Sequence, residues 1–255
     1  MRDRMATDMT RLSVNINKVA TLRNQRPQLN IPDLVRCATI CLEAGAAGIT
    51  IHPRPDERHI RSSDVPQIAQ LVSRYTDAEF NIEGNPFQGD YMSHCRTTRP
   101  TQATLVPDDA SQNTSDHGWD LAKDAQRLRP IIAELKNFGC RVSLFMDPLP
   151  EMMDVAAEIG ADRIELYTEP YAAAFARGDK NPTDAFAAAG KRAAEVGLGV
   201  NAGHDLNLHN LAPFLQKVPN VLEVSIGHAL IADALEFGLV DTVRQYRRAC
   251  GNDAA

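Results

Sequence analysis

Two histidines and two glutamates lie in or directly after short apolar runs of this 255-residue sequence. His52, Glu83, Glu165 and His204 carry the side chains that most often transfer protons in enzymes. Histidine titrates near neutral pH, and burial raises the pKa of a carboxyl group, so the four together suit a reaction with several proton transfers. Each residue taken alone also fits a structural hydrogen-bonding role.

Basic side chains are concentrated in two segments, although the chain as a whole has a net charge of -6. Local positive charge in an acidic protein favours a small anionic substrate, because arginine and lysine form charge-assisted hydrogen bonds with phosphate and carboxylate groups. Solvated surface arginines are the alternative interpretation. The basic residues of the two segments are Lys18, Arg23, Arg26, Arg54, Arg58 and Arg61.

A second candidate anion site lies near the end of the chain, where an apolar run leads through Gly227 and His228 into a helical pattern. Glycine lets a ligand approach the backbone closely, and the free N–H groups of a helix start attract phosphate. A plain tight turn explains Gly227 equally well. The sequence lacks GxxxxGK[ST], so a nucleotide-binding P-loop is not expected.

Some of these polar side chains are also potential ligands for a divalent cation, namely His52, Glu165, His204 and His228. However, the sequence contains neither the HExxH motif nor a His-x-His pair at the end of an apolar run. We therefore predict a reaction that needs no metal and no cofactor.

The elements that must position these side chains are visible as short apolar runs alternating with longer helical patterns. The runs are rich in Val, Ile, Leu and Phe, as expected of buried parallel strands. Four helical patterns end in a glycine that leads into a strand, which is typical of αβ turns: Gly45, Gly139, Gly160 and Gly197. The predicted strands are 12–16, 48–52, 79–83, 102–106, 141–146, 163–167, 198–201 and 222–226.

Eight strand–helix units in a chain of this length predict an α/β fold, the closed (β/α)8 TIM barrel. An open doubly wound sheet is the alternative. The active site of a barrel lies at the carboxyl ends of the strands, where nearly every predicted strand delivers a polar or ionisable group. The opposite rim is expected to carry mostly glycine and small residues. The long polar segment from Pro107 to Trp119 is expected to be a lid or a surface loop.

No linker or low-complexity stretch divides the chain. We expect one barrel domain over residues 11–250, flexible ends at 1–10 and 251–255, and a start at Met1 or Met5. The acidic charge argues against nucleic acid and anionic membranes as partners. No apolar run approaches the ~20 residues of a membrane span, and no signal peptide is evident. Five cysteines without a CxxC pair suggest reduced thiols in a cytoplasmic protein.

Eight motifs follow one another in the order of the predicted strands: VNINKVATLRNQR, GITIHPRPDERHIR, FNIEGNP, TLVPDD, VSLFMD, IELYTEPYA, VNAGHDLN and LEVSIGHALI. Together they resemble the pyridoxine 5'-phosphate synthase family over nearly the whole chain. The resemblance implies a (β/α)8 barrel with additional helices, a homo-octamer and a reaction without a metal. It also implies that 1-deoxy-D-xylulose 5-phosphate condenses with 3-amino-2-oxopropyl phosphate, releasing pyridoxine 5'-phosphate, phosphate and water.

The resemblance implies roles for the four proton-transfer candidates. His52 and Glu83 correspond to general bases, His204 to the proton donor, and Glu165 to a residue that stabilises charged intermediates. All four are retained, so the resemblance predicts an active enzyme. The alternatives are another cofactor-free barrel enzyme acting on sugar phosphates, such as a Schiff-base aldolase, and a barrel that only binds phosphate. An aldolase needs a strand-end lysine, and only Lys18 lies close to one.

Substrate contacts are implied in the same way. Asn15 and Arg26 should contact the amino-ketone phosphate, and Gly227 and His228 should lie at the phosphate site beside the last strand. The residues expected at the deoxyxylulose phosphate are Arg54, His59, Thr114, Asn17 and Lys18.

Three of the positions depart from the usual pattern of the family. Asn17 stands where aspartate is usual, Lys18 where histidine is usual, and Asp205 where glycine is common. The first two changes make the local charge more positive at the expected sugar-phosphate site. Asp205 is expected either to alter the pKa of His204 or to pair with a neighbouring lysine.

Overall fold

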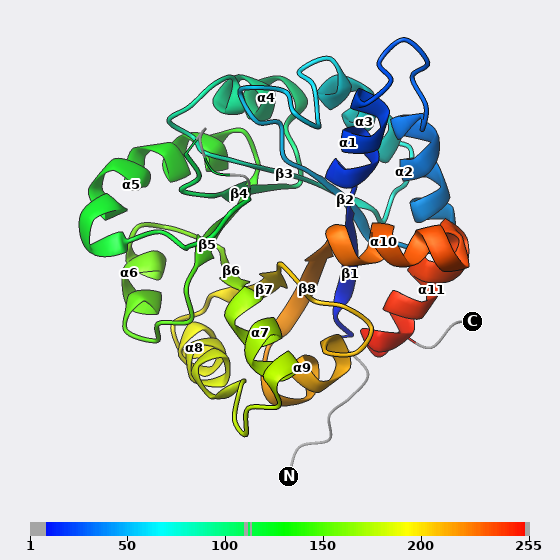
Figure 1. Ribbon diagram of the computed structural model, residues 1–255. Coiled ribbons are helices and arrows are strands. Elements are labelled where there is room, and N and C mark those ends of the chain that lie inside the picture. Colours follow the sequence, from blue (N-terminus) through cyan, green and yellow to red (C-terminus); the bar gives the residue numbers. More distant parts are fainter. Residues whose placement is uncertain (1–8, 110–111, 113, 253–255) are drawn as a thin grey trace.

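The strands of the computed structural model form one closed parallel barrel, within the described residues 9–109, 112 and 114–252 (Figure 1). Each strand pairs with the next along the chain, and β1 pairs with β8, which excludes the open doubly wound sheet. The predicted (β/α)8 barrel is therefore confirmed. The strands are β1 (Arg11–Asn15), β2 (Gly48–Ile51), β3 (Glu79–Gly84), β4 (Gln102–Leu105), β5 (Arg141–Met146), β6 (Arg163–Tyr167), β7 (Gly199–Gly203) and β8 (Val221–Ile226).

Helices surround the outside of the barrel (Figure 1). They are α1 (Asn17–Asn24), α2 (Leu34–Glu43), α3 (Asp64–Val72), α4 (Tyr91–Thr98), α5 (Leu121–Asn137), α6 (Met152–Glu158), α7 (Glu169–Arg177), α8 (Asp184–Glu195), α9 (Leu211–Lys217), α10 (His228–Phe237) and α11 (Leu239–Ala249). The additional helices arise because α1/α2, α7/α8 and α10/α11 are pairs. In the part of the chain that the structure describes, no helix is long and apolar enough to cross a membrane.

The glycines predicted to end helices do so with left-handed backbone geometry. Gly45, Gly139, Gly160 and Gly197 follow α2, α5, α6 and α8, and their φ angles lie between 82° and 97°. Glycine adopts this conformation without the steric penalty that a Cβ atom brings. Each glycine therefore ends a helix and lets the chain turn directly into the next strand.

Both ends of the predicted domain are anchored where the structure describes them. The buried Thr10 donates its hydroxyl to the Val221 carbonyl at 2.8 Å, and the Asn252 side chain donates to the Thr10 carbonyl at 2.9 Å. Thr10 and Asn252 thus differ from the flexible ends expected there. The remainder of those expected ends, residues 1–8 and 253–255, lies outside the described residues.

One aromatic cluster in the core joins α7, α8 and α9. The fully buried Phe214 has its ring centroid 4.9 Å from that of Tyr171 and 5.6 Å from that of Phe186. Tyr171 also donates its hydroxyl to the Asn210 carbonyl, which joins the cluster to the residue before α9. Rings at these separations pack in favourable tilted and edge-to-face arrangements.

Phe214→Ala is expected to lower the free energy of unfolding by about 3–5 kcal/mol, because the lost ring leaves a cavity that its neighbours fill only in part. Denaturant unfolding followed by circular dichroism measures this change. Leu149→Ala is the control, since Leu149 is 45% exposed and its truncation should cost about 0.5 kcal/mol or less. Equal losses for the two variants would contradict the packing described for Phe214.

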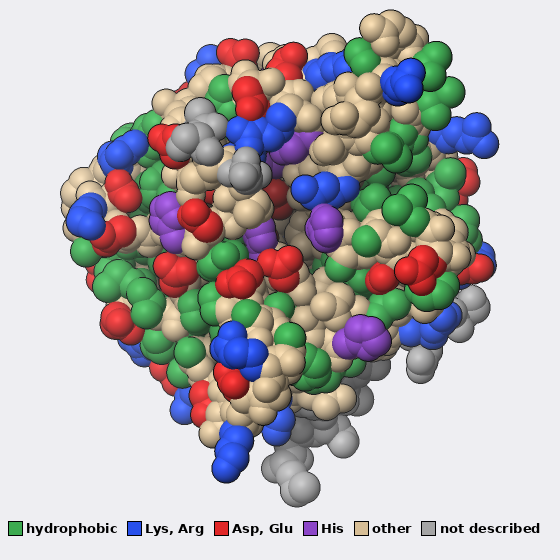
Figure 2. All heavy atoms as spheres, viewed as in Figure 1, with side chains coloured by type: hydrophobic (Ala, Val, Ile, Leu, Met, Phe, Trp, Pro, Cys, Tyr) green, Lys and Arg blue, Asp and Glu red, His purple; other side chains and the backbone are tan. Residues whose placement is uncertain are grey.

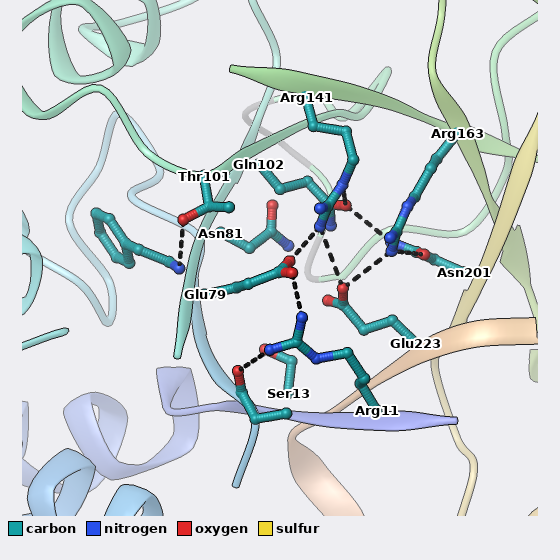
Figure 3. A network of polar contacts seen from close by, with 12 residues as sticks. Arg11, Ser13, Glu79, Asn81, Thr101, Gln102, Arg141, Arg163, Asn201 and Glu223 are labelled. Carbon is teal, nitrogen blue, oxygen red and sulfur yellow. Dashed lines mark hydrogen bonds and ion pairs between the residues drawn. The ribbon is translucent and has the colours of Figure 1, made fainter. Parts of the chain in front are cut away.

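Charged side chains fill the barrel mouth at the amino ends of the strands, so the expectation of small residues there is wrong. Arg11, Glu79, Arg141 and Arg163 are the first residues of their strands, and Glu223 lies near the start of β8. Figure 3 shows these side chains converging across the mouth. Glu79 pairs with Arg11 and Arg141, and Glu223 pairs with Arg141 and Arg163. Burial of these charges is tolerated because each has an oppositely charged partner.

Candidate active site

A cavity of about 340 Å³ lies at the carboxyl ends of the strands, the end where the sequence places most of its polar groups. Its size suits a small substrate. Figure 2 shows histidine, basic and acidic side chains gathered around a hollow in this face. The predicted residues that line the cavity are Asn15, Asn17, Lys18, His52, Arg54, His59, Glu83, Thr114, Glu165, His204, Asp205, Gly227 and His228.

Glu83, near the end of β3, is held by side chains from two other strands. Its Oε2 accepts a hydrogen bond from Asn15 at 3.2 Å, and its Oε1 accepts one from Ser225 at 3.4 Å. Burial and then the Asp108 carboxylate raise the pKa of Glu83 to about 8, against the opposing effect of the Ser225 hydrogen bond. A carboxyl group with such a pKa can gain or lose a proton near neutral pH, as a general base must.

His52 directly follows β2 and is buried. Its backbone N–H donates to Asn17 Oδ1 at 3.0 Å, so Asn17 fixes the end of β2 in addition to lining the cavity. Burial and then the positive charge of Arg54 lower the pKa of His52 well below its usual value. The imidazole is therefore neutral at neutral pH and can accept a proton. Although His52 Nδ1 lies 3.8 Å from Glu83 Oε2, a neutral ring forms no ion pair there.

Glu165, the third residue of β6, is 3% exposed, and its Oε2 has no hydrogen-bond partner within the described residues. Burial, followed by the charges of Glu83 and Glu223, raises the pKa of Glu165 well above its usual value and so favours the protonated carboxyl. Its register partner on β7 is Asn201, but its carboxyl group reaches Gly203, where a Cβ atom would lie only 2.6 Å from Glu165 Oε1. The absent side chain leaves room for a carboxylic acid that can donate a hydrogen bond to a bound molecule.

His204 follows β7, and its ring packs against an aromatic wall. The ring centroids of Phe145 and Tyr167 lie 5.8 Å and 5.4 Å from that of His204. Phe145 is buried and lines the cavity together with Val106. This wall restricts the orientation of the imidazole. A fixed orientation suits a group that transfers protons, because proton transfer depends on geometry.

The turn that carries His204 has a strained backbone. The φ angles of His204 and Asp205 are 79° and 56°, in the left-handed region that side chains other than glycine rarely adopt. Thr168 holds this turn by donating its hydroxyl to the carbonyl oxygens of Gly203 and His204. Asp205 Oδ2 lies 4.0 Å from His204 Nδ1, and the histidine lowers the pKa of Asp205. Asp205 therefore places a negative charge beside the imidazole.

A group of hydrogen-bond donors forms one side of the cavity. Arg54 is buried and donates to the Asp108 carboxylate. His59 Nδ1 accepts the Ile60 backbone N–H at 2.9 Å, which places the ring proton on Nε2. Burial and then Arg54 lower the pKa of His59 to about 4, so the ring is a neutral donor. With the Thr114 hydroxyl in the same lining, this side can bind an anion.

A second side of the cavity is formed where β8 passes into α10. Gly227 separates the two elements, and a Cβ atom there would lie 3.2 Å from the Asn15 side chain. Only glycine leaves the Asn15 side chain its present position. The first N–H groups of α10, which starts at His228, have no partners within the helix and favour a negatively charged ligand.

Arg26 is the one predicted residue that the structure leaves outside the cavity. It lies exposed just beyond α1, whereas the residues of the same segment nearer the strand, Asn17 and Lys18, line the cavity. Arg23, another member of the predicted basic cluster, is buried and pairs with Asp64. The basic cluster therefore divides into cavity, core and surface residues.

Several residues that line the cavity or contact its lining were not predicted from the sequence. Val106 and Phe145 belong to apolar runs and carry no signal that distinguishes a cavity wall from core. Ser115 lies in the predicted polar segment from Pro107 to Trp119, and Ser225 lies in the predicted strand 222–226. Asp108, in the TLVPDD motif, contacts two residues of the cavity lining, Arg54 and Ser115. In the described part of the chain, no group of three or more potential ligands is arranged to hold a metal ion.

A closed (β/α)8 barrel whose strand ends bring acid–base groups and anion-binding groups to one cavity belongs to the class of barrel enzymes. More specifically, the chain belongs to the family described as "Pyridoxal phosphate biosynthesis protein PdxJ", which it matches over residues 12–252.

Curated relatives support this assignment over nearly the full length. The chain is 56% identical to the pyridoxine 5'-phosphate synthase of Albidiferax ferrireducens, covering 94% of this chain and 96% of the relative. It is 54% identical to the enzyme of the same name from Xylella fastidiosa, covering 93% of each. Among solved structures, tryptophan synthase from M. tuberculosis in its open form has a TM-score of 0.64 at 12% identity, covering 95% of this chain and 93% of that one. Such low identity shows a shared fold alone.

Proposed function

We propose that this chain is a pyridoxine 5'-phosphate synthase that joins 3-amino-2-oxopropyl phosphate to 1-deoxy-D-xylulose 5-phosphate. The products are pyridoxine 5'-phosphate, phosphate and water. Its main support is the convergence of His52, Glu83, Glu165 and His204 on one cavity that also has two anion-binding sides. Attack of an amine on a ketone, dehydration and ring closure require successive proton transfers, and these four side chains are of the types that transfer protons.

The pKa shifts of His52, Glu83 and Glu165 suggest a different role for each residue in the reaction. The neutral His52 accepts the proton that the attacking amine loses, and Glu83, with a pKa of about 8, accepts a later one. The raised pKa of Glu165 favours its protonated form, and its Oε2 has no partner among the described residues, so it donates a hydrogen bond to charge that develops on the intermediates. His204 protonates the hydroxyl that leaves as water. A water-excluding cavity makes each of these interactions stronger than it is in bulk solvent.

The two phosphate groups have separate places in this proposal. Arg54, His59 and Thr114, with Asn17 and Lys18 nearby, bind the deoxyxylulose phosphate. Asn15, Gly227 and His228 bind the amino-ketone phosphate, and Arg26 is proposed to approach it from outside the cavity. Asp205, beside His204, is also proposed to contact substrate.

The direct test mixes purified protein with both phosphates and follows pyridoxine 5'-phosphate by absorbance and mass. A ring product of the expected mass supports the proposal, and an acyclic product or none at all contradicts it. Borohydride trapping of Lys18 with a ketone phosphate would instead favour a Schiff-base aldolase. Binding of both phosphates without turnover would favour a non-catalytic barrel.

Arg54→Ala is expected to raise the KM for deoxyxylulose phosphate by ~10–100-fold, since hydrogen bonds to charged groups contribute about 1.5–3 kcal/mol. The KM for the amino-ketone phosphate should change little, because that substrate is assigned to the other side of the cavity. Initial rates at a saturating concentration of the second substrate separate the two constants. Unaltered saturation by deoxyxylulose phosphate would remove Arg54 from its site.

Metal chelators are expected to leave the rate unchanged, because protein side chains supply every proposed proton transfer. The measurement compares turnover before and after prolonged dialysis against EDTA. Loss of activity that zinc restores would establish a metal-dependent reaction instead.

We also propose a homo-octamer in the cytoplasm, as the family resemblance implies. Large apolar side chains are exposed on two neighbouring parts of the surface, which supports association: Leu22, Leu29, Ile31, Leu235, Phe237 and Val240. Figure 2 shows apolar side chains over α2 and α10. The five cysteines are free, which suits a reducing compartment. Light scattering after gel filtration measures the assembly.

A further inference from the structure

The arginine assigned to the sugar phosphate, Arg54, forms a buried ion pair with Asp108. Arg54 and Asp108 are 6% and 3% exposed, and the Arg54 guanidinium donates to Asp108 Oδ2. Arg54 lines the cavity, whereas Asp108 is absent from the cavity lining that the described residues form. The cavity therefore presents the cation, and its counter-ion lies on the far side.

Asp108 also joins the two loops that make up this side of the cavity. The oxygen that accepts from Arg54, Oδ2, also accepts the Ser115 hydroxyl at 2.7 Å, while the Asp108 carbonyl accepts from Asn85 at 3.0 Å. Ser115 lies next to Thr114 in the cavity lining. The other carboxylate oxygen, Oδ1, is buried and has no hydrogen-bond partner in the described part of the chain.

We infer that Asp108 is a positioning residue that acts through Arg54, as a built-in counter-ion that limits the affinity of this side of the cavity for phosphate. The inference rests on the proposed function for the identity of the substrate. In the empty site the carboxylate compensates the buried arginine, which would otherwise be an unpaired charge. When a phosphate dianion binds Arg54, it lies in the field of the Asp108 negative charge as well.

The negative charge of Asp108 and its hydrogen bonds to Arg54 and Ser115 should have opposite effects on phosphate affinity. A residue that only held Arg54 and the loop in place would weaken phosphate binding when replaced. Neutralising a counter-ion strengthens phosphate binding instead, because the phosphate is then the only negative charge that pairs with Arg54. A limited affinity also lets released phosphate leave the site between turnovers.

Asp108→Asn is the substitution that separates the two roles. The amide oxygen can replace Oδ2 and keep the hydrogen bonds from Arg54 and Ser115, while the amide nitrogen replaces the oxygen that accepts none within the described residues. Calorimetry with deoxyxylulose phosphate, and separately with inorganic phosphate, is expected to show ~10-fold tighter binding than in the unaltered protein, because the negative charge beside Arg54 is removed; a tenfold change in Kd corresponds to about 1.4 kcal/mol. The KM for the amino-ketone phosphate should stay within about twofold.

Asp154→Asn is the matched control, because Asp154 pairs with Arg192 on the outer helices and its replacement removes the same unit of charge. It should leave phosphate affinity unchanged. Weaker or unaltered binding by a folded Asp108→Asn variant overturns the inference. If that variant fails to fold, Asp108→Ala carries the same expectation of tighter binding. Inorganic phosphate tests the counter-ion even if the protein does not bind deoxyxylulose phosphate, a result that would contradict the proposed function instead.

Discussion

His204→Asn is expected to lower kcat by ~10²–10⁴-fold, the usual effect of removing a general acid or base. The ring lies against Phe145 and Tyr167, where asparagine is smaller and leaves the neighbouring side chains their space. Asparagine also tolerates the left-handed backbone of this position better than most residues. The loss should therefore come from the missing proton donor. Steady-state formation of pyridoxine 5'-phosphate measures kcat for the variant.

Two further measurements assign this loss to chemistry. Binding of deoxyxylulose phosphate by calorimetry should stay within about threefold, since the phosphate is assigned to Arg54 on another part of the lining. His209→Asn serves as the control, because His209 is exposed and lies outside the cavity lining. It should keep the full rate. A His204→Asn enzyme that turns over at the rate of the His209→Asn enzyme would exclude His204 as the proton donor.

The fold and much of the candidate site could be predicted because the ends of the strands can be recognised in the sequence as the ends of short apolar runs. His52, Glu83 and His204 each lie at or just beyond a short apolar run, and a parallel barrel brings all such positions to one rim. The same logic placed Gly227 between the last strand and its helix. These assignments depend on chain order alone, so they need no knowledge of side-chain packing.

Other features depend on pairings between distant residues, which no local pattern reveals. Arg11 and Glu79 are 68 positions apart and meet because only β2 separates β1 from β3 in the barrel. Asp108 and Arg54 are 54 positions apart in two different loops. The left-handed backbone of Asp205 is set by the turn after β7. Such contacts are a property of the closed barrel, so the sequence predicted mostly glycine and small residues at the rim where Arg11 and Glu79 lie.

Glu83→Gln is expected to lower kcat by ~10²–10⁴-fold and to remove a limb of its pH dependence. A base must be ionised to accept a proton, so kcat of the unaltered enzyme should rise with pH until it passes the Glu83 pKa of about 8. Glutamine has no such transition, and the residual rate should lose this rise. A pH series of kcat from 6 to 9.5 for both proteins makes the comparison. A rise around pH 8 that persists unchanged in the variant would assign it to another group.

The same substitution should affect stability in the opposite sense. The folded pKa of Glu83 lies above its ordinary value of 4.5, so the protonated form is the one that the fold favours. Its contribution to stability is complete below pH 4.5 and is lost as the pH rises through about 8. Glutamine resembles the protonated carboxyl and does not ionise. Glu83→Gln should therefore unfold at a higher temperature than the unaltered protein at pH 9, with a much smaller difference at pH 5. Glu134→Gln is the control and should keep kcat, because Glu134 pairs with Arg96 on the outer helices. A Glu83→Gln protein that is both active and no more stable at pH 9 would show that Glu83 is not the buried base.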